Sequence, residues 1–465
     1  MSRMDWHWRK VLARGAIDRP VIFGFAANAW QILAAPISLL LIAKFLTPAI
    51  QGYYFTFGSV LALSVFAEMG LGRVVIQFAS HEWASVSLGP DGEISGDAGA
   101  RSRLASLFKF SSLWYSAVGV TVAGGIGLAG YVFFSWNPHP EVVWVWPWFS
   151  LCFLTGVDLY LSNFTFMLEG CNQLSQVYFY QFIRRIVTSS VLWLVLFLGG
   201  NLWIAPAALV AAILWTLIYL GVRYRAFLSQ LLFFPITSKL SWGKDLWPMQ
   251  WRIAVSWISG YFAFSLFTPV IFHYWGPVEA GRIGMTWKLA STLMMGATAV
   301  IIPKGPQFGI LIAKKAYQAL DKLFYKTVVS ATLIALAGSS AVFLLVFVLY
   351  RYHYPLASRM LGPLPTAFFL MAAVLMQVSI AQSTYLRAYR KEPFMVLSVA
   401  AGALIALSTW ALGSRYGCTA VAAGYLAVTA LFSVPCGALI WRRCRKAWNV
   451  PGGLNDPAEI QPAYP

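Results

Sequence analysis

The chain has 465 residues, of which 59% are hydrophobic and only 11% are charged, and its mean hydropathy is +0.68. No polar stretch is long enough to form a soluble domain, which excludes a soluble multidomain enzyme. The formal net charge of +18 reflects mostly membrane topology and attraction to anionic headgroups. Nucleic-acid binding is not expected.

About twelve apolar runs of roughly 20–27 residues follow one another along the chain. A run of about 20 apolar residues, at ~1.5 Å per residue, crosses a hydrocarbon layer of ~30 Å. The runs are 21–43, 53–79, 110–135, 145–168, 176–199, 204–222, 248–273, 282–303, 327–350, 364–386, 394–413 and 419–441. The sequence therefore predicts an all-α integral membrane protein with about twelve transmembrane helices.

The gap between 223 and 247 separates the first six runs from the last six. The first run is too long for the apolar core of a signal peptide, so we expect it to be retained. The predicted divisions are a basic cytoplasmic N-terminus (1–20), an N-lobe (21–222), a cytoplasmic linker (223–247), a C-lobe (248–446) and a disordered cytoplasmic tail (447–465).

Basic residues fall almost entirely in every second gap between the apolar runs. Their clusters lie at 3–19, 101–109, 223–244, 304–326, 390–391 and 442–446, and the intervening gaps carry few. Because cytoplasmic loops are enriched in Lys and Arg, this alternation predicts an even number of spans with both termini cytoplasmic.

A Pro-x-x-x-Gly pattern occurs twice, at Pro48–Gly52 and at Pro277–Gly281. Both copies lie in a predicted external loop that joins the first two spans of a six-span half. We interpret them as traces of an internal duplication, with the two lobes related by a pseudo-two-fold axis along the membrane normal. Such lobes leave a cleft that rocking exposes to each side in turn, which is a transporter architecture.

The five cysteines and five histidines are dispersed, so no disulfide framework, metal site or cofactor is expected. No nucleophile–base arrangement and no phosphate-binding glycine loop is visible either. We therefore do not expect an enzyme.

Charged residues within or beside the apolar runs are the candidate functional residues, because a charge at mid-bilayer costs ~2.5–3.5 kcal/mol on insertion scales and should face a protein interior or a wet cavity. The basic set outnumbers the acidic one. The predicted lining of a cationic cavity is Arg73, Arg184, Arg185, Arg252 and Lys288, and the acids considered for coupling or structure are Glu68 and Asp158. Such a lining would attract an anionic headgroup, and Arg forks suit pyrophosphate.

Alternative interpretations remain open for these residues. Asp158 shares a helical face with Ser162, Thr165 and Glu169, and it could serve only to neutralise an arginine, Arg184 or Arg185, on the neighbouring span. Ser and Thr side chains commonly hold membrane helices together, and an arginine near a span end can extend to the interface.

The stretch from Pro48 to Tyr54, followed by an apolar run and then Glu68-Met69-Gly70-Leu71, resembles the polysaccharide flippases. These are the Wzx-like exporters of the multidrug/oligosaccharidyl-lipid/polysaccharide (MOP) superfamily, and their fold is MATE-like. The twelve-span count and the six-plus-six division extend the resemblance over nearly the whole chain. Glu68 occupies the acidic position of the family's motif.

The resemblance implies flipping of an undecaprenyl-pyrophosphate-linked oligosaccharide across a bacterial inner membrane by alternating access, for surface polysaccharide synthesis. The implied partners are the lipid-linked oligosaccharide, membrane lipids, and a polysaccharide polymerase and glycosyltransferases. Coupling to H+ or Na+ is a further expectation. The alternatives are a drug or small-metabolite exporter of the same fold, and a membrane polysaccharide polymerase, which the short, acid-poor external loops disfavour.

Overall fold

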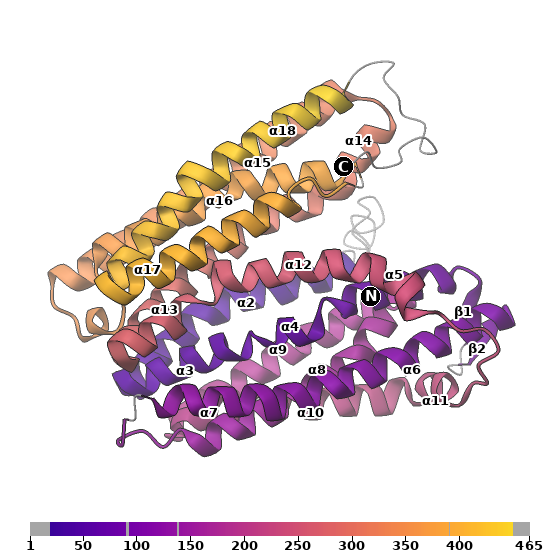
Figure 1. Cartoon of the computed structure of the whole chain (residues 1–465), viewed down its shortest axis with the longest axis horizontal. Coiled ribbons are helices and arrows are strands. Elements are labelled where there is room, and N and C mark those ends of the chain that lie inside the picture. The colour runs from indigo at the N-terminus through magenta and orange to yellow at the C-terminus, as the bar shows by residue number, and fades with distance from the viewer. Residues whose placement is uncertain (1–18, 90–92, 137–138, 390, 450–465) are drawn as a thin grey trace, which may run out of the picture. The chain divides into compact units, whose positions relative to one another are not determined.

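The computed structural model describes residues 19–89, 93–136, 139–389 and 391–449, and in these ranges nearly all of the regular structure is helical (Figure 1). Most of the predicted basic N-terminus and of the predicted tail lies outside the described residues. The chain divides into two compact units, Met1–Met285 and Thr286–Pro465, and each is described by itself. Residues 223–247 lie inside the first unit, and the lobe boundaries placed there stay a prediction.

The first unit contains most of the helices and the one short sheet of the described chain. Its elements are α2 (Arg19–Phe45), α3 (Pro48–Leu61), α4 (Ser64–Glu68), α5 (Leu71–Trp83), β1 (Val86–Leu88), β2 (Ile94–Gly96), α6 (Ala98–Val120), the π-helical η1 (Thr121–Ile126), α7 (Gly127–Ser135), α8 (Val145–Gly170), α9 (Leu174–Phe197), the 3-10 turn η2 (Asn201–Trp203), α10 (Ile204–Arg223), α11 (Arg225–Phe233), the π-helical η3 (Trp242–Leu246), α12 (Trp247–Phe264) and the first part of α13 (Phe267–Ile301).

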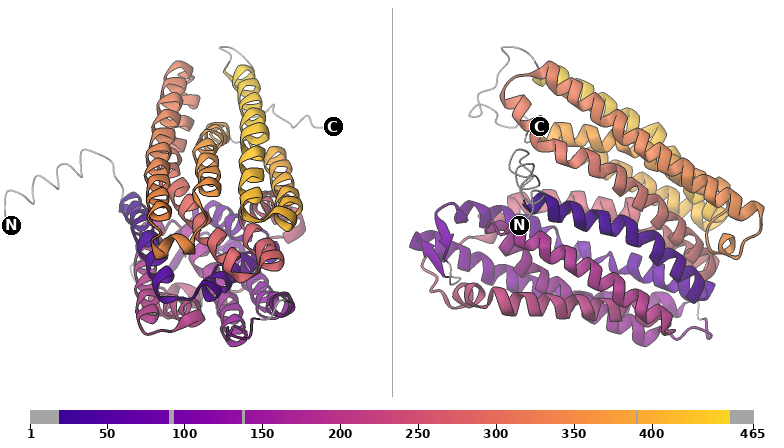
Figure 2. Two further views of the ribbon diagram at one scale, coloured as in Figure 1. Left: turned by 90° about the vertical axis from the view of Figure 1, so that its left-hand side faces the viewer. Right: turned by 180° about the vertical axis from the view of Figure 1, so that it is seen from behind.

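The second unit begins within α13 and is wholly helical in its described residues. Its further elements are the 3-10 turn η4 (Ile302–Lys304), α14 (Gly305–Ala313), α15 (Tyr317–Arg351), the 3-10 turn η5 (Pro355–Arg359), α16 (Pro363–Arg387), α17 (Met395–Val428), the π-helical η6 (Thr429–Ser433) and α18 (Val434–Trp448). The long helices of this unit run side by side as a bundle (Figure 2).

Ten helical stretches of the described chain are long and apolar enough to cross a membrane. Two of these stretches contain a glycine with a non-helical backbone, Gly276 (φ 83°, ψ 176°) and Gly417 (φ 73°, ψ −160°). Divided at these glycines, the stretches become twelve apolar helical segments, as the sequence predicts. The all-α integral membrane fold is confirmed.

Large apolar side chains point outward from the helices of both units. Val222 is 83% exposed in the first unit, and Leu344 is 62% exposed in the second. Outward-facing side chains of this kind would be a liability in water, whereas hydrocarbon solvates them well. The chain is therefore a multi-pass membrane protein.

The second apolar run does not form one continuous helix, which corrects the prediction of a single span over 53–79. The short α4 ends before Met69 and Gly70, and α5 begins after them. Met69 (φ 51°) and Gly70 (φ 67°) have left-handed backbones, which end a right-handed helix. A Cβ on Gly70 would also lie 2.4 Å from Cγ2 of Ile253 on α12. The break leaves Glu68 at the end of a short helix.

Helices α2 and α9 pack together through reciprocal tryptophan–serine hydrogen bonds. The indole N–H of Trp30 on α2 donates to Ser189 on α9 at 2.9 Å, and that of Trp193 on α9 donates to Ser38 on α2 at 2.9 Å. These bonds satisfy the polar edge of each indole within an apolar interface. They fix the first span against the fifth.

Between α5 and α6 the chain forms an antiparallel hairpin of β1 and β2. Ser102, fully buried on α6, accepts hydrogen bonds from the backbone N–H groups of Thr237 (2.8 Å) and Ser238 (2.9 Å). The hairpin and α11 lie at the same end of the first unit, opposite α3 and α7 (Figure 1). The predicted linker is thus attached to the first unit rather than free.

An aromatic and ionic cluster joins three helices of the second unit. Trp441 of α18 stacks on Phe324 of α15, with ring centroids 4.8 Å apart. Arg445 forms an ion pair with Asp321 at 2.5 Å, and the hydroxyl of buried Tyr385 on α16 contacts the same carboxylate at 3.4 Å. The basic end of α18 is therefore held by specific partners within its own unit.

Candidate functional site

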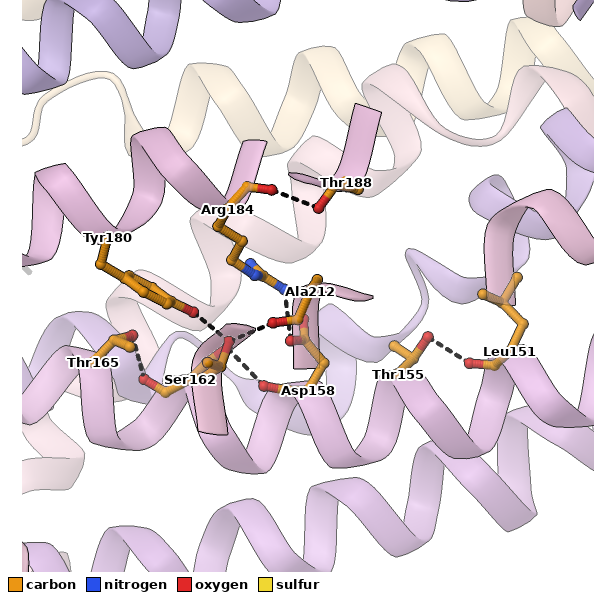
Figure 3. Close-up of polar contacts among 10 residues, drawn as sticks. Leu151, Thr155, Asp158, Ser162, Thr165, Tyr180, Arg184, Thr188 and Ala212 are labelled. Atoms are coloured by element: carbon orange, nitrogen blue, oxygen red, sulfur yellow. Dashed lines mark hydrogen bonds and ion pairs between the residues drawn. The ribbon is translucent and has the colours of Figure 1, made fainter. Parts of the chain in front are cut away.

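An ion pair inside the apolar spans joins α8 and α9. Arg184 on α9 donates from Nη2 to Oδ1 of Asp158 on α8 at 2.6 Å, with 29% and 20% of the two side chains exposed (Figure 3). The spacing of Asp158 and the two arginines along their helices pointed to such a pair, with Arg184 or Arg185 as the partner. The structure selects Arg184 as that partner.

The hydroxyl groups predicted to share a face with Asp158, and that of Thr188 on α9, bond to their own helices. Ser162 donates to the backbone oxygen of Asp158 at 2.8 Å, Thr165 to that of Ser162 at 2.8 Å, and Thr188 to that of Arg184 at 2.7 Å (Figure 3). Bonds of this kind satisfy a hydroxyl within one helix. The bonds of these three hydroxyl groups therefore do not link neighbouring helices, contrary to one interpretation of the sequence.

Arg185, next to Arg184 on α9, reaches in another direction. Its Nη1 donates to the backbone oxygen of Ala27 at 2.8 Å and to Oδ1 of Asn28 on α2 at 3.0 Å. It forms no ion pair with any carboxylate in the described ranges. A guanidinium has five N–H groups, so this half-buried arginine keeps its positive charge uncompensated and has donors beyond those used on α2.

Arg73 lies in the first turn of α5, which packs against α8. It interacts electrostatically with Glu169 of α8 and with Tyr178 of α9, without forming a close ion pair to either. Tyr178 and Arg185 are seven residues apart on α9, so they share a face about 10 Å apart along the axis. Arg73 is therefore placed near the face of α9 that carries Tyr178 and Arg185.

Arg252 lies beside the break in the second span. It precedes Ile253, whose side chain packs against Gly70, and its guanidinium lies over the ring of Trp251 at 5.6 Å. Its side chain is exposed. The structure thus brings Arg252, Arg73 and Glu68 to the same α4–α5–α12 region, a grouping that their separation in the sequence did not reveal.

Lys288 belongs to the second unit, in the part of α13 after Met285. Its side chain is exposed, and none of the ion pairs among the described residues includes it. Four of the five predicted cations therefore lie in the first unit. A shared cavity lined by all five stays a prediction.

Comparison with known proteins places this geometry in a known fold. No protein-family model matches the chain, and no curated protein matches it in sequence. The lipid II flippase MurJ in an inward closed conformation matches with a TM-score of 0.64 and 12% identity, covering 92% of this chain and 87% of that chain. The inward-facing conformation of a multidrug resistance MATE family transporter of the MOP superfamily matches with a TM-score of 0.58 and 13% identity, covering 88% and 99%.

A MOP superfamily transporter from Pyrococcus furiosus also matches, with a TM-score of 0.56, 15% identity, and 93% and 96% coverage. For that protein, a reversed polarity of the binding pocket suggests a different function. Identities this low show the fold alone. The chain has the MOP-transporter fold.

Sequence reasoning missed one residue of this MOP-fold chain that contacts the candidate set, and one fully buried polar residue on a neighbouring helix. Tyr115 of α6 donates a hydrogen bond to Glu68 at 2.9 Å, and Asn163 of α8 is fully buried beside Ser112 of α6. A tyrosine or asparagine in an apolar run carries little signal by itself. Only the packing of α4 against α6 brings Tyr115 to Glu68.

Proposed function

We propose that this MOP-fold chain flips an undecaprenyl-pyrophosphate-linked oligosaccharide from the cytoplasmic to the external leaflet of a bacterial inner membrane, by alternating access and with both termini cytoplasmic. The supporting observation is the uncompensated positive charge on the helices of the first unit. Asp158 neutralises Arg184, whereas Arg185 and Arg252 form no ion pair among the described residues. The apolar runs of the second half contain no Asp or Glu at all.

The physical reason is the cost of moving a pyrophosphate through hydrocarbon. An isolated charge transferred from water into an apolar medium costs tens of kcal/mol by idealised solvation arguments, so a lipid headgroup needs compensating cations along its path. Guanidinium groups offer charge-assisted, often bidentate hydrogen bonds to phosphate oxygens. The polyprenyl tail stays in the bilayer, where apolar surfaces cost nothing.

The same charge balance disfavours the main alternative, an exporter of cationic drugs. A cation would be repelled by a lining in which basic side chains exceed acidic ones. A polysaccharide polymerase is disfavoured by the scarcity of acidic residues in the predicted external loops. A polymerase and glycosyltransferases instead enter the proposal as partners that consume and supply the lipid-linked oligosaccharide.

Deletion of the gene in its host should cause the lipid-linked oligosaccharide to accumulate on the cytoplasmic side, with loss of the surface glycan. The wild-type chain should restore export, and Arg185→Gln should restore about a tenth of it or less, because losing a charge-assisted hydrogen bond costs ~1.5–3 kcal/mol. Arg185→Lys, which keeps the charge, should fall between the two. The measurement is the amount of lipid-linked intermediate and of surface glycan at matched protein levels.

The matched control is Arg351→Gln, at the exposed end of α15, which should export like the wild type. Full export by Arg185→Gln would remove Arg185 from the proposal. If the deletion cells become drug-sensitive and keep an intact surface glycan, the chain would be a drug exporter and the flippase proposal would be wrong.

A further inference from the structure

We propose that Trp242, Trp247 and Trp251, on η3 and the start of α12, form a tryptophan platform that binds sugar rings of the transported lipid beside its pyrophosphate. The inference rests on the proposed function and extends it to the part of the substrate that the arginines do not bind. The ligand class is a pyranose sugar. Such a ring offers an apolar C–H face to an aromatic side chain and carries hydroxyl oxygens around its edge.

The segment that leads into α12 is fixed along α6. Ser102 of α6 accepts a hydrogen bond from the backbone N–H of Thr237, and the ring of Trp242 lies 5.9 Å from that of Trp114 on the same helix. Trp114 follows Ser102 by twelve residues, which is about 18 Å along a helix axis. The segment therefore runs alongside α6 and brings Trp242 to the start of an apolar span.

The three indoles of the platform follow one another along the chain and in space. The ring centroids of Trp242 and Trp247 are 5.1 Å apart. Trp247 and Trp251 are four residues apart on α12, so they lie on one face of that helix. Trp242 and Trp251 are both exposed. The platform therefore has an accessible aromatic side chain at each end.

One end of the platform meets a free cation. The guanidinium of Arg252 lies over the ring of Trp251 at 5.6 Å, and its side chain is exposed and belongs to none of the ion pairs among the described residues. In the proposed substrate the pyrophosphate is bonded directly to the first sugar. From Trp247 to Arg252 the helix rises by about 7.5 Å. A pyrophosphate bound by Arg252 would therefore place its sugars against the neighbouring tryptophans.

Two buried donors next to Trp242 lack partners. Gln250 of α12 is fully buried, and its Oε1 accepts from the indole N–H of Trp242 at 2.9 Å. Because an indole can only donate, this bond fixes the orientation of the amide. Nε2 of Gln250 and the indole N–H of Trp114 are buried without a hydrogen-bond partner in the described part of the chain. Such donors are costly, and the hydroxyl oxygens of a sugar that shifts Trp242 would satisfy them.

An interfacial tryptophan belt is the ordinary interpretation of indoles near the end of a span. Belt tryptophans keep the polar N–H edge of the indole among water and headgroups. Here Trp242 directs its N–H to the fully buried Gln250, and the N–H of Trp114 is buried as well. The polar edges are turned into the protein while part of Trp242 stays exposed, which suits a stacking surface better than a belt.

Aromatic rings also bind organic cations, but the charges around the platform oppose this. Lys244 and Arg252 belong to none of the ion pairs among the residues that the structure describes. The only acid between residues 241 and 253 is Asp245, whose carboxylate accepts a hydrogen bond from the backbone N–H of Ser241 at 2.7 Å. This excess of positive charge disfavours a cationic ligand. It favours a neutral sugar attached to an anion.

The test measures how two unlabelled lipids displace a fluorescent undecaprenyl pyrophosphate from the purified full chain in detergent. One is undecaprenyl pyrophosphate, and the other carries a disaccharide of glucose residues on its pyrophosphate. We expect the sugars to increase the affinity of the wild type about tenfold, equivalent to ~1.4 kcal/mol. Trp242→Ala should lose most of this gain and keep its affinity for the sugar-free lipid. Trp242→Phe, which keeps a ring, should retain part of the gain.

The matched control is Gly243→Ala, whose added Cβ would meet nothing within 4 Å and which should keep the whole gain. Unchanged binding of the sugar-free lipid shows that a variant is folded. Trp251→Ala, which removes an exposed ring, should lose part of the gain and provides a second test if Trp242→Ala does not fold.

A gain that survives in both alanine variants of the platform would overturn the proposal, and so would equal affinity of the wild type for the two lipids. Displacement of the fluorescent lipid by ethidium that depends on Trp242 would replace the sugar with an organic cation. If the fluorescent lipid does not bind at all, the proposed function itself fails, and the platform fails with it. Loss of the sugar-dependent gain alone leaves the flippase proposal standing.

Discussion

Gly52→Ala should severely destabilise the protein, whereas Gly58→Ala on the same helix should be tolerated. A Cβ on Gly52 would lie 1.8 Å from the carbonyl oxygen of Pro277 and 2.5 Å from its carbonyl carbon, both of them backbone atoms. A Cβ on Gly58 would meet nothing within 4 Å. We expect a loss of about 3 kcal/mol or more at Gly52, the upper end of overpacking costs, and a gain of up to ~1 kcal/mol at Gly58 from helix propensity.

Gly281→Ala gives the intermediate member of the series. Its Cβ would lie 3.0–3.3 Å from backbone atoms of Gly52 and Pro48, close enough to require a small shift. Thermal unfolding of detergent-purified variants, followed by the loss of the monodisperse chromatographic peak, should rank stability as Gly58→Ala above Gly281→Ala above Gly52→Ala. Equal midpoints for Gly52→Ala and Gly58→Ala would refute the close approach of these helix starts.

This contact gives the repeated Pro-x-x-x-Gly pattern a physical meaning. Pro48 begins α3 after the capping residue Thr47, and Pro277 resumes the helix after Gly276. The glycine four residues later in each copy lets the two helix starts touch through their backbones, and Nε2 of Gln51 donates to the backbone oxygen of Gly281 at 3.0 Å. The two motifs are visible in the sequence, but the sequence could not show that they pack against each other.

Asp158→Asn should destabilise the first unit, and Arg184→Gln added to it should restore much of the loss. Removing one partner of a buried pair costs ~3–5 kcal/mol, because the other charge is left in an apolar setting. Here the two side chains are 29% and 20% exposed, so we expect about 2–3 kcal/mol. The double variant leaves no charge to desolvate, and a thermal double-mutant cycle over the four proteins measures the coupling.

The same four proteins separate a structural role of Arg184 from a role in binding. A double variant that is stable but fails to export would show that the pair has a role in transport beyond its role in stability. A stable double variant that exports like the wild type would limit the pair to packing of α8 against α9. If the stability losses of the two single variants simply add up in the double variant, the result would contradict the ion pair itself.

The fold could be predicted because it depends on features local in sequence. Length and hydropathy determined the spans, and the sequence placed Asp158 on one span and its possible partners, Arg184 and Arg185, on the next. The break at Met69 and Gly70 could not be predicted in the same way, since it depends on Ile253 of α12, far along the chain, packing where a Cβ would otherwise sit. A glycine in an apolar run does not by itself reveal that contact.

The candidate site was predictable only as a set of charges. Depth in the membrane singled out Arg73, Arg184, Arg185, Arg252 and Lys288, but not their partners. Asn28 and Ala27 hold Arg185 through α2, and Tyr115 holds Glu68 through α6. These contacts depend on which helices are neighbours, and the hydropathy pattern carries no information on that point.

The central claim is that basic side chains in the spans carry a pyrophosphate-bearing lipid across the bilayer. The most direct test reconstitutes the purified chain in liposomes with a fluorescent undecaprenyl-pyrophosphate-linked sugar and follows the labelled headgroup by its access to an external quencher. We predict protein-dependent movement between leaflets that falls at least about tenfold in an Arg185→Gln/Arg252→Gln variant, which leaves the Asp158–Arg184 pair intact, through loss of charge-assisted hydrogen bonds. Movement of a cationic drug across the same membranes, with the labelled lipid left in its original leaflet, would contradict the account.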